Sequence, residues 1–142
     1  MISQTLLIAA RPFGGRLDAE RVCAAIADGL RDGGWQADPC PIELEPADGA
    51  AGFVRSPEFD ARMRGARAVV IAEPRLDERT LAGTVAFELA TRARQGGVPA
   101  YAVTGENDLD SFDARILDLQ TILVARTHRS LALAGRKLAG IV

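Results

Sequence analysis

The segment Arg67–Gly105 constrains the fold most strongly, because it reads as a strand, a helix and a second strand in succession. The apolar run Arg67–Ala72 predicts a buried strand, and Glu73–Asp77 is an acidic turn after it. Leucine, valine and alanine then recur at helical spacing from about Glu78 to Gln95, where two glycines end the helix. Val98–Thr104 is the next apolar strand. This βαβ unit favours a parallel sheet covered by helices.

The rest of the chain repeats this alternation. Pro39 and Pro41 place the second strand at an edge of the sheet, because proline has no N–H to donate to a neighbouring strand. We interpret Glu45–Arg55 as a loop. The expected fold is one domain, residues 1–142, with a three-layer αβα architecture and a five-stranded parallel sheet in the flavodoxin-like or Rossmann-like order 2-1-3-4-5. The other expected strands are Thr5–Ala10, Gln36–Leu44 and Gln120–Ala125, and the other helices begin at Asp18, Ser56, Ser111 and either Thr127 or Ser130.

Composition excludes several classes of function. A net charge of -2 and the interspersed arginines argue against nucleic-acid binding. The two cysteines, Cys23 and Cys40, are too few for a disulfide framework and are expected to be small buried side chains. The single histidine, His128, cannot form a histidine-rich metal site. The start lacks a basic signal-peptide region and no apolar run is long enough to cross a membrane, so we expect a cytoplasmic protein.

The loop after the first strand is a candidate binding site, because the carboxyl ends of parallel strands meet at the ligand-binding edge of such sheets. It reads Arg11-Pro12-Phe13-Gly14-Gly15. Two glycines before a helix resemble a phosphate-binding turn, since they free backbone N–H groups beside the positive helix end. They equally suit a plain turn. Arg11 is either a cation for a carboxylate or phosphate, or a solvated loop residue.

The loops after the third and fourth strands carry acids to the same edge. Glu73 either pairs with Arg11 across the neighbouring loop or faces a ligand. Asp77 can act on a ligand, as a general base or by orienting a hydroxyl, or it can cap the following helix. The acids within Glu106–Asp110 are expected to be solvated and to cap a helix, so no metal site is predicted.

Three stretches together resemble the bacterial glycerate kinase family. They are LLIAARPFGGRLDAERVCAAIADGL, ADGAAG at residues 47–52, and GARAVVIAEPRLDERTLAGTVAFELATRARQGGVPAYAVTG. Members of that family are ATP-dependent kinases with two α/β domains and an active site between them. The resemblance implies that this chain lacks the second domain. The resemblance also implies that ATP and magnesium are cofactors of this chain only if the family activity is retained.

The residues that match the family motifs are mixed with departures. Arg11 stands where the family has an aspartate, and Gly14 and Thr84 stand where it has lysines. Ala51 stands where the family has a glutamate, and Pro12 where it has a serine. The residues that match the family motifs are Phe13, Glu73, Asp77, Thr80 and Gly83.

Three functions follow from this pattern. The first is a degenerate kinase-like domain that binds a small anionic metabolite. Glu73 and Asp77 are then the retained catalytic-type residues, and the ligand-binding candidates are Arg11, Phe13, Gly14, Gly15, Arg75, Thr80 and Gly83. The second is a glycerate kinase with residual activity, or half of a split kinase whose other domain is a separate partner chain. The third is a homodimeric or partner-binding module.

Overall fold

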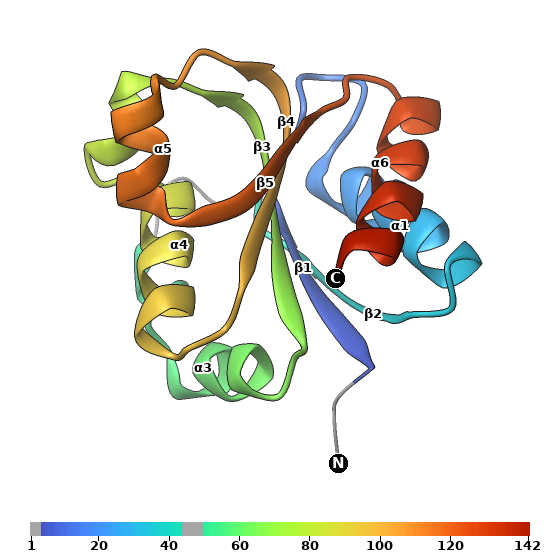
Figure 1. Cartoon of the computed structure of the whole chain (residues 1–142), viewed down its shortest axis with the longest axis horizontal. Helices are drawn as coiled ribbons and strands as arrows, with labels where there is room; N and C mark the ends of the chain where they lie inside the picture. Colours follow the sequence, from blue (N-terminus) through green and yellow to red (C-terminus); the bar gives the residue numbers. More distant parts are fainter. Residues whose placement is uncertain (1–3, 44–49) are drawn as a thin grey trace.

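Five parallel strands in the order β2-β1-β3-β4-β5 form the centre of the computed structural model (Figure 1). The structure describes residues 4–43 and 50–142. The order is the one expected from the sequence. The strands are β1 Thr5–Ala10, β2 Gln36–Pro41, β3 Ala68–Leu76, β4 Ala100–Asn107 and β5 Leu119–Val124.

Helices cover both faces of the sheet. Figure 1 shows α1 and α6 together on one side of the strands and α3, α4 and α5 on the other. Within the described ranges, no helix is long and apolar enough to cross a membrane. The elements are α1 Ala19–Asp32, α2 Ala50–Val54, α3 Pro57–Arg64, the short 3-10 helix η2 Glu78–Leu81, α4 Val85–Gln95, α5 Ser111–Leu117 and α6 His128–Ile141.

The strands carry continuous apolar runs because both faces of the sheet are buried. In β1, Leu6 and Ile8 pack into the core beneath α1 and α6, whereas Leu7 and Ala9 pack into the core beneath α3 and α4. Successive side chains of a strand point to opposite faces, so one strand supplies both cores. The architecture is therefore three layers with two cores.

The α1 and α6 helices pack at close range through glycines. A Cβ on Gly29 would overlap the backbone of Ala132 and Arg136, and a Cβ on Gly135 would overlap the carbonyl of Ile26. Trp35, three residues after the end of α1, adds a 2.9 Å hydrogen bond from its indole N–H to the carbonyl of Ala139. The glycines thus let two helix backbones approach each other.

The central βαβ unit differs from the sequence-based prediction in two places. Strand β3 continues to Leu76, because it stays paired with β4 as far as Asn107, so the expected turn at Glu73–Asp77 is mostly strand. The expected helix Glu78–Gln95 is divided into η2 and α4. Gly83 has a φ of 83° and breaks the helical path between them.

Several boundaries also differ. The expected loop Glu45–Arg55 contains helix α2, while its residues 44–49 lie outside the described part of the chain. Helix α5 is capped by Asp110, not Ser111, since the Asp110 carboxylate accepts the Asp113 amide at 2.8 Å. Thr127 is the cap of α6.

The prolines of β2 lie at the outer edge of the sheet, as the sequence predicted. The Gln36 and Ile42 amides donate to Gln4 and Ala10 on the β1 side. Because backbone groups alternate along a strand, Pro39 and Pro41 fall on the side that faces away from β1. Neither proline has an N–H to offer another strand there.

Candidate functional site

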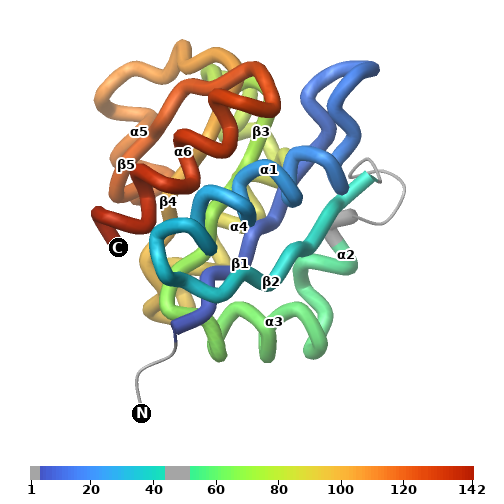
Figure 2. The backbone as a smooth tube through the Cα atoms, turned by 90° about the vertical axis from the view of Figure 1, so that its right-hand side faces the viewer, coloured from blue at the N-terminus to red at the C-terminus, as the bar shows by residue number. Residues whose placement is uncertain are grey.

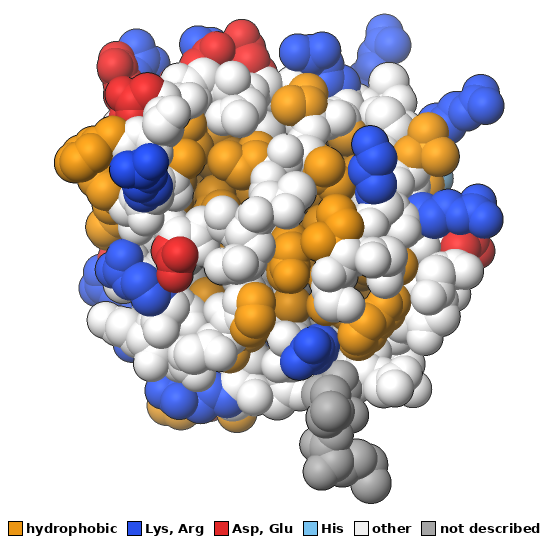
Figure 3. Space-filling view, in the orientation of Figure 1, with side chains coloured by type: hydrophobic (Ala, Val, Ile, Leu, Met, Phe, Trp, Pro, Cys, Tyr) orange, Lys and Arg blue, Asp and Glu red, His pale blue; other side chains and the backbone are white. Residues whose placement is uncertain are grey.

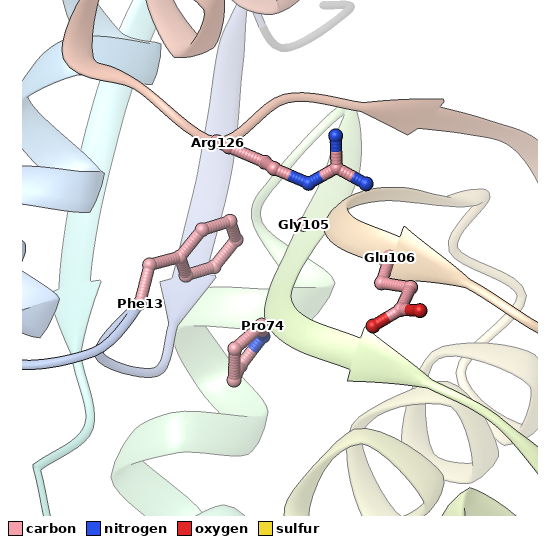
Figure 4. A pocket seen from close by; sticks show the side chains of 5 residues that line it. All are labelled: Phe13, Pro74, Gly105, Glu106 and Arg126. Atoms are coloured by element: carbon pink, nitrogen blue, oxygen red, sulfur yellow. The ribbon is translucent and has the colours of Figure 1, made fainter.

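A pocket of about 230 Å³ lies where the carboxyl ends of the central strands meet (Figure 4). Phe13 reaches it from the loop after β1, Pro74 comes from β3, Gly105 and Glu106 from β4, and Arg126 follows β5. The strand order reverses between β1 and β3, next to this pocket. Ligands of open α/β sheets bind at such a switch point.

The close approach of β3 and β4 forms the floor of the pocket. A Cβ on Gly105 would lie 2.7 Å from the carbonyl oxygen of Pro74, closer than real Cβ contacts. Glycine at this position therefore lets the two strands stay paired beyond the end of β1. In Figure 4, Gly105 lies in the middle of the site, with Phe13, Pro74, Glu106 and Arg126 around it.

Arg126 supplies the positive charge of this pocket. Its backbone N–H donates to the Ser130 hydroxyl at 3.0 Å, in the turn that starts α6. The preceding residue, Ala125, donates to Thr104 at 2.9 Å and so continues the pairing of β5 with β4. The Arg126 side chain is exposed, and a guanidinium in this position can bind a carboxylate or a phosphate with two parallel hydrogen bonds.

Arg11 is placed differently from a solvated loop arginine. Only 7% of the residue is exposed, and its Nη1 donates to the carbonyl of Ile42 at 2.9 Å. Its backbone N–H donates to Ala72 at 2.9 Å. Arg11 thus fastens the segment after β2 to the ends of β1 and β3. Glu73, the next residue of β3, is partly buried, and both of its sequence-based roles stay predictions.

Protein carboxylates already occupy the N-terminal end of α1. Asp18 accepts the Arg21 amide at 2.8 Å, and the Glu43 side chain accepts the Ala19 amide at 2.8 Å. Gly14 and Gly15 are exposed and precede a short turn before the helix. An anion held by these glycines would have to share this helix end with two carboxylates, which is electrostatically unfavourable.

Arg75 forms ion pairs with the acidic residues of the neighbouring loops, at the same edge of the sheet as the pocket. Its guanidinium lies 3.1 Å from Asp77, 3.1 Å from Asp108 and 3.6 Å from Glu106. These four residues tie the end of β3 to the end of β4. Among the described residues, no group of three or more His, Cys, Asp or Glu side chains is arranged to hold a metal ion.

The matched motif residues after β3 are hydrogen-bonded to one another. Asp77 accepts the Arg79 amide at 2.9 Å, and the Thr80 hydroxyl accepts the Asp77 amide at 3.1 Å, which forms a capping box. The Thr84 hydroxyl accepts the Phe87 amide at 3.2 Å and donates to the Thr80 carbonyl at 2.8 Å. These side chains therefore stabilise the η2–α4 connection.

Both cysteines are buried in environments that disfavour the thiolate form. Burial raises the pKa of Cys23 from 9.0 to about 12, and burial also raises the pKa of Cys40. A thiol with a raised pKa is almost entirely protonated at neutral pH and reacts slowly. Both side chains are packed in the cores, as the sequence predicted.

The structure brings together only some of the residues singled out in the sequence. Phe13 lines the central pocket, Arg75 and Asp77 line a neighbouring one, and His128 is an exposed residue at the start of α6. Sequence analysis missed Pro74, Gly105 and Arg126, and it interpreted Glu106 as one of a run of solvated acids. Arg126 had a usable signal, because it comes two residues after the last strand, at the same edge as the loops that were considered.

Comparisons with known proteins agree with this fold. Residues 54–134 match the model of the glycerate kinase family. A diflavin flavoprotein A3 from Nostoc sp. is similar over 98% of this chain and 93% of its own, with 16% identity and a TM-score of 0.54. A response regulator receiver domain from Rhodospirillum rubrum is similar over 95% and 90%, with 12% identity and a TM-score of 0.55. No curated protein matches in sequence.

Proposed function

Because this chain belongs to the glycerate kinase family, we propose that it is a member that binds a small anionic metabolite without transferring phosphate. The observation that carries the proposal is the role of Thr84, which caps α4 where the family has a lysine. A threonine in this position carries no charge, and its hydroxyl is already used in two hydrogen bonds.

Phosphoryl transfer depends on cations that neutralise the spreading charge of the transferred group. This chain has Gly14 at the other lysine position, and Gly14 is exposed at a φ of 81°. Arg11, at the position of the family's aspartate, is bound to the Ile42 carbonyl. The lysine positions and the aspartate position therefore lack the groups that a kinase uses.

The pocket around Gly105 supports the binding part of the proposal. Its volume of about 230 Å³ lies below the range typical of drug-sized ligands, which favours a small metabolite. Arg126 offers a bidentate donor for a carboxylate or phosphate, and Phe13 and Pro74 offer apolar walls. Glu106 also lines the pocket, and its partner Arg75, at 3.6 Å, lies closer to Asp77 and Asp108, so an anion would be bound on the Arg126 side of the pocket.

Binding is tested by thermal unfolding in the presence of glycerate, phosphoglycerates and sugar phosphates, since a ligand that binds the folded state raises the melting temperature. We expect Arg126→Ala to abolish the rise caused by the best ligand. Arg129→Ala is the matched control, because Arg129 is also exposed at the start of α6 but does not line the pocket. The proposed site would be contradicted if both variants lost the ligand-induced rise in melting temperature equally, or if Arg126→Ala kept that rise unchanged.

Phosphate transfer is tested separately with ATP, magnesium and glycerate. We expect the protein to form no more phosphoglycerate than a control reaction from which the protein is omitted. Turnover that is lost in Asp77→Ala would contradict the proposal and support the alternative of a residual glycerate kinase. Turnover that appears only when a second chain is added would instead support half of a split kinase.

A further inference from the structure

The central pocket carries two opposite charges that are not paired with each other. Arg126 and Glu106 both line the pocket, and both residues are exposed. Among the described residues, Glu106 is paired with Arg75, and the Arg126 side chain forms no ion pair. Figure 4 shows the Arg126 guanidinium and the Glu106 carboxylate on different sides of the pocket, with Gly105 between them. One small ligand can therefore contact both charges.

The charge of Glu106 is only partly compensated by the protein. Its partner Arg75 lies 3.6 Å away and is closer to Asp77 and to Asp108, each at 3.1 Å. Because one guanidinium cannot neutralise three carboxylates, the Glu106 side of the pocket keeps a negative charge. A carboxylate binds a charged donor about twice as strongly as a neutral one. Glu106 therefore favours a cationic group on the ligand over a neutral hydroxyl.

The segments that carry these charges meet at one end of the molecule. Glu106 is near the end of β4, and Arg126 follows β5. Figure 2 shows the segments after β1, β4 and β5 together at the end of the molecule opposite the start of β1. In Figure 3, the acidic side chains of the upper margin gather toward its left, whereas its right part carries basic side chains. This end of the molecule therefore has an acidic part and a basic part, and the pocket contains a residue of each sign.

We propose that the ligand of this pocket is a small amino acid, free or as its phosphate ester, with its anionic group at Arg126 and its ammonium group at Glu106. This inference rests on the proposed binding function and names the class of its ligand. A guanidinium binds a carboxylate or phosphate through two parallel hydrogen bonds, and a carboxylate accepts charge-assisted hydrogen bonds from an ammonium group. Phe13 and Pro74 form the apolar walls, and the volume of about 230 Å³ favours a compact molecule.

A hydroxy acid of the same size fits the two charges less well. Its carboxylate can bind Arg126, but its hydroxyl brings no positive charge to Glu106. The negative charge of the ligand is then repelled by Glu106, because like charges brought together in a binding site weaken the complex. In an amino acid, the ammonium group offsets this repulsion and forms the stronger hydrogen bond. The pocket should therefore discriminate between two ligands that differ only in this group.

Two pairs of compounds differ only in an ammonium or a hydroxyl group: serine and glycerate, and O-phosphoserine and 3-phosphoglycerate. Isothermal titration of the full chain measures the dissociation constant of each compound. We expect the amino compound to bind at least about tenfold more tightly than its hydroxy partner. Tighter binding of O-phosphoserine than of serine would identify the group at Arg126 as a phosphate, and the reverse order would identify it as a carboxylate. Hydroxy compounds that bind as tightly as the amino compounds overturn this inference but leave the anion site of the proposed function standing, whereas no binding of any of the four overturns both.

Glu106→Gln tests the residue assigned to the ammonium group. Glutamine keeps the length of the side chain and an acceptor oxygen but has no charge, so the advantage of the amino compound should fall to about twofold or less. Glu78→Gln is the matched control, because Glu78 is an exposed acid at the same edge that lines the neighbouring pocket around Arg75 instead of the central one. Since both glutamates are exposed, both variants should fold. A preference that Glu106→Gln leaves unchanged, or that both variants lose equally, overturns the inference.

Discussion

The hydroxyl of Thr84 donates a 2.8 Å hydrogen bond to the carbonyl oxygen of Thr80. This contact spans the turn at Gly83 and links the end of η2 to the start of α4. The same hydroxyl accepts the Phe87 amide. A position that would carry a lysine for phosphate chemistry in the family is here part of the local hydrogen bonding of the fold.

Replacing this cap should therefore lower stability. We expect Thr84→Lys to reduce the free energy of unfolding by about 1 kcal/mol, the usual loss when a helix cap is removed. Urea unfolding measures the change. Thr91→Ala, in the interior of α4, is the control and should change stability by less than about 0.5 kcal/mol. A Thr84→Lys variant as stable as the unaltered chain would show that the cap contributes little.

Two glycines of α6 should respond in opposite directions to alanine. A Cβ on Gly135 would overlap the Ile26 carbonyl, so Gly135→Ala should cost about 1–3 kcal/mol by forcing α1 and α6 apart. Gly140 has open space at the Cβ position, and Gly140→Ala should be neutral or gain up to about 1 kcal/mol from helix propensity. Chemical unfolding of both variants gives the comparison. Equal effects would rule out close backbone packing as the cause.

Arg62 should contribute more to stability than its neighbour Arg64. Arg62 donates to both oxygens of Asp38, at 3.1 and 2.9 Å, and to the Pro39 carbonyl at 3.0 Å, and these contacts hold α3 to β2. The hydrogen bonds to Asp38 also raise the pKa of Arg62. We expect Arg62→Ala to cost about 1–2 kcal/mol. Arg64→Ala, which removes an exposed pair with Asp60, should cost less than about 0.5 kcal/mol. Similar losses in urea unfolding would mean that the Arg62 contacts are screened by solvent.

The buried Cys23 thiol should make the protein less stable in alkali. The pKa of Cys23 is 9.0 ordinarily and about 12 in the fold, so above pH 9 the unfolded chain loses this proton while the folded chain keeps it. The contribution is complete below pH 9 and is lost as pH rises toward 12. Urea unfolding at several pH values should show a shallower alkaline decline in Cys23→Ala. An identical slope in both proteins would mean that other groups cause the decline.

Much of the fold could be predicted from the sequence because it depends on local patterns. Continuous apolar runs such as Thr5–Ala10 mark strands buried on both faces, and the prolines of β2 mark an edge. The division between η2 and α4 was missed, since the apolar spacing of Leu81, Val85 and Leu89 continues across the break. Only the conformation of Gly83 reveals it.

The pocket was harder to predict than the fold. Its floor depends on Gly105 and Pro74, which are distant in sequence and meet only because β3 and β4 pair beyond the end of β1. The burial of Arg11 was equally hard to predict. Arg11 is buried against Ile42 because of the position of β2, and the sequence of its own loop does not show this. Loop composition indicated the edge of the sheet at which the pocket lies, whereas the contacts within the pocket required the pairing of the strands.

The packing of α1 against α6 has a consequence for synthesis of the protein. Trp35 and its partner Ala139 are 104 residues apart in the chain. While the ribosome is still making the intervening residues, the apolar side of α1 has no α6 to cover it. That side stays exposed until α6 has emerged, and exposed apolar surface on nascent chains is what chaperones bind. One whole layer of the domain is therefore expected to form only in the last stage of translation.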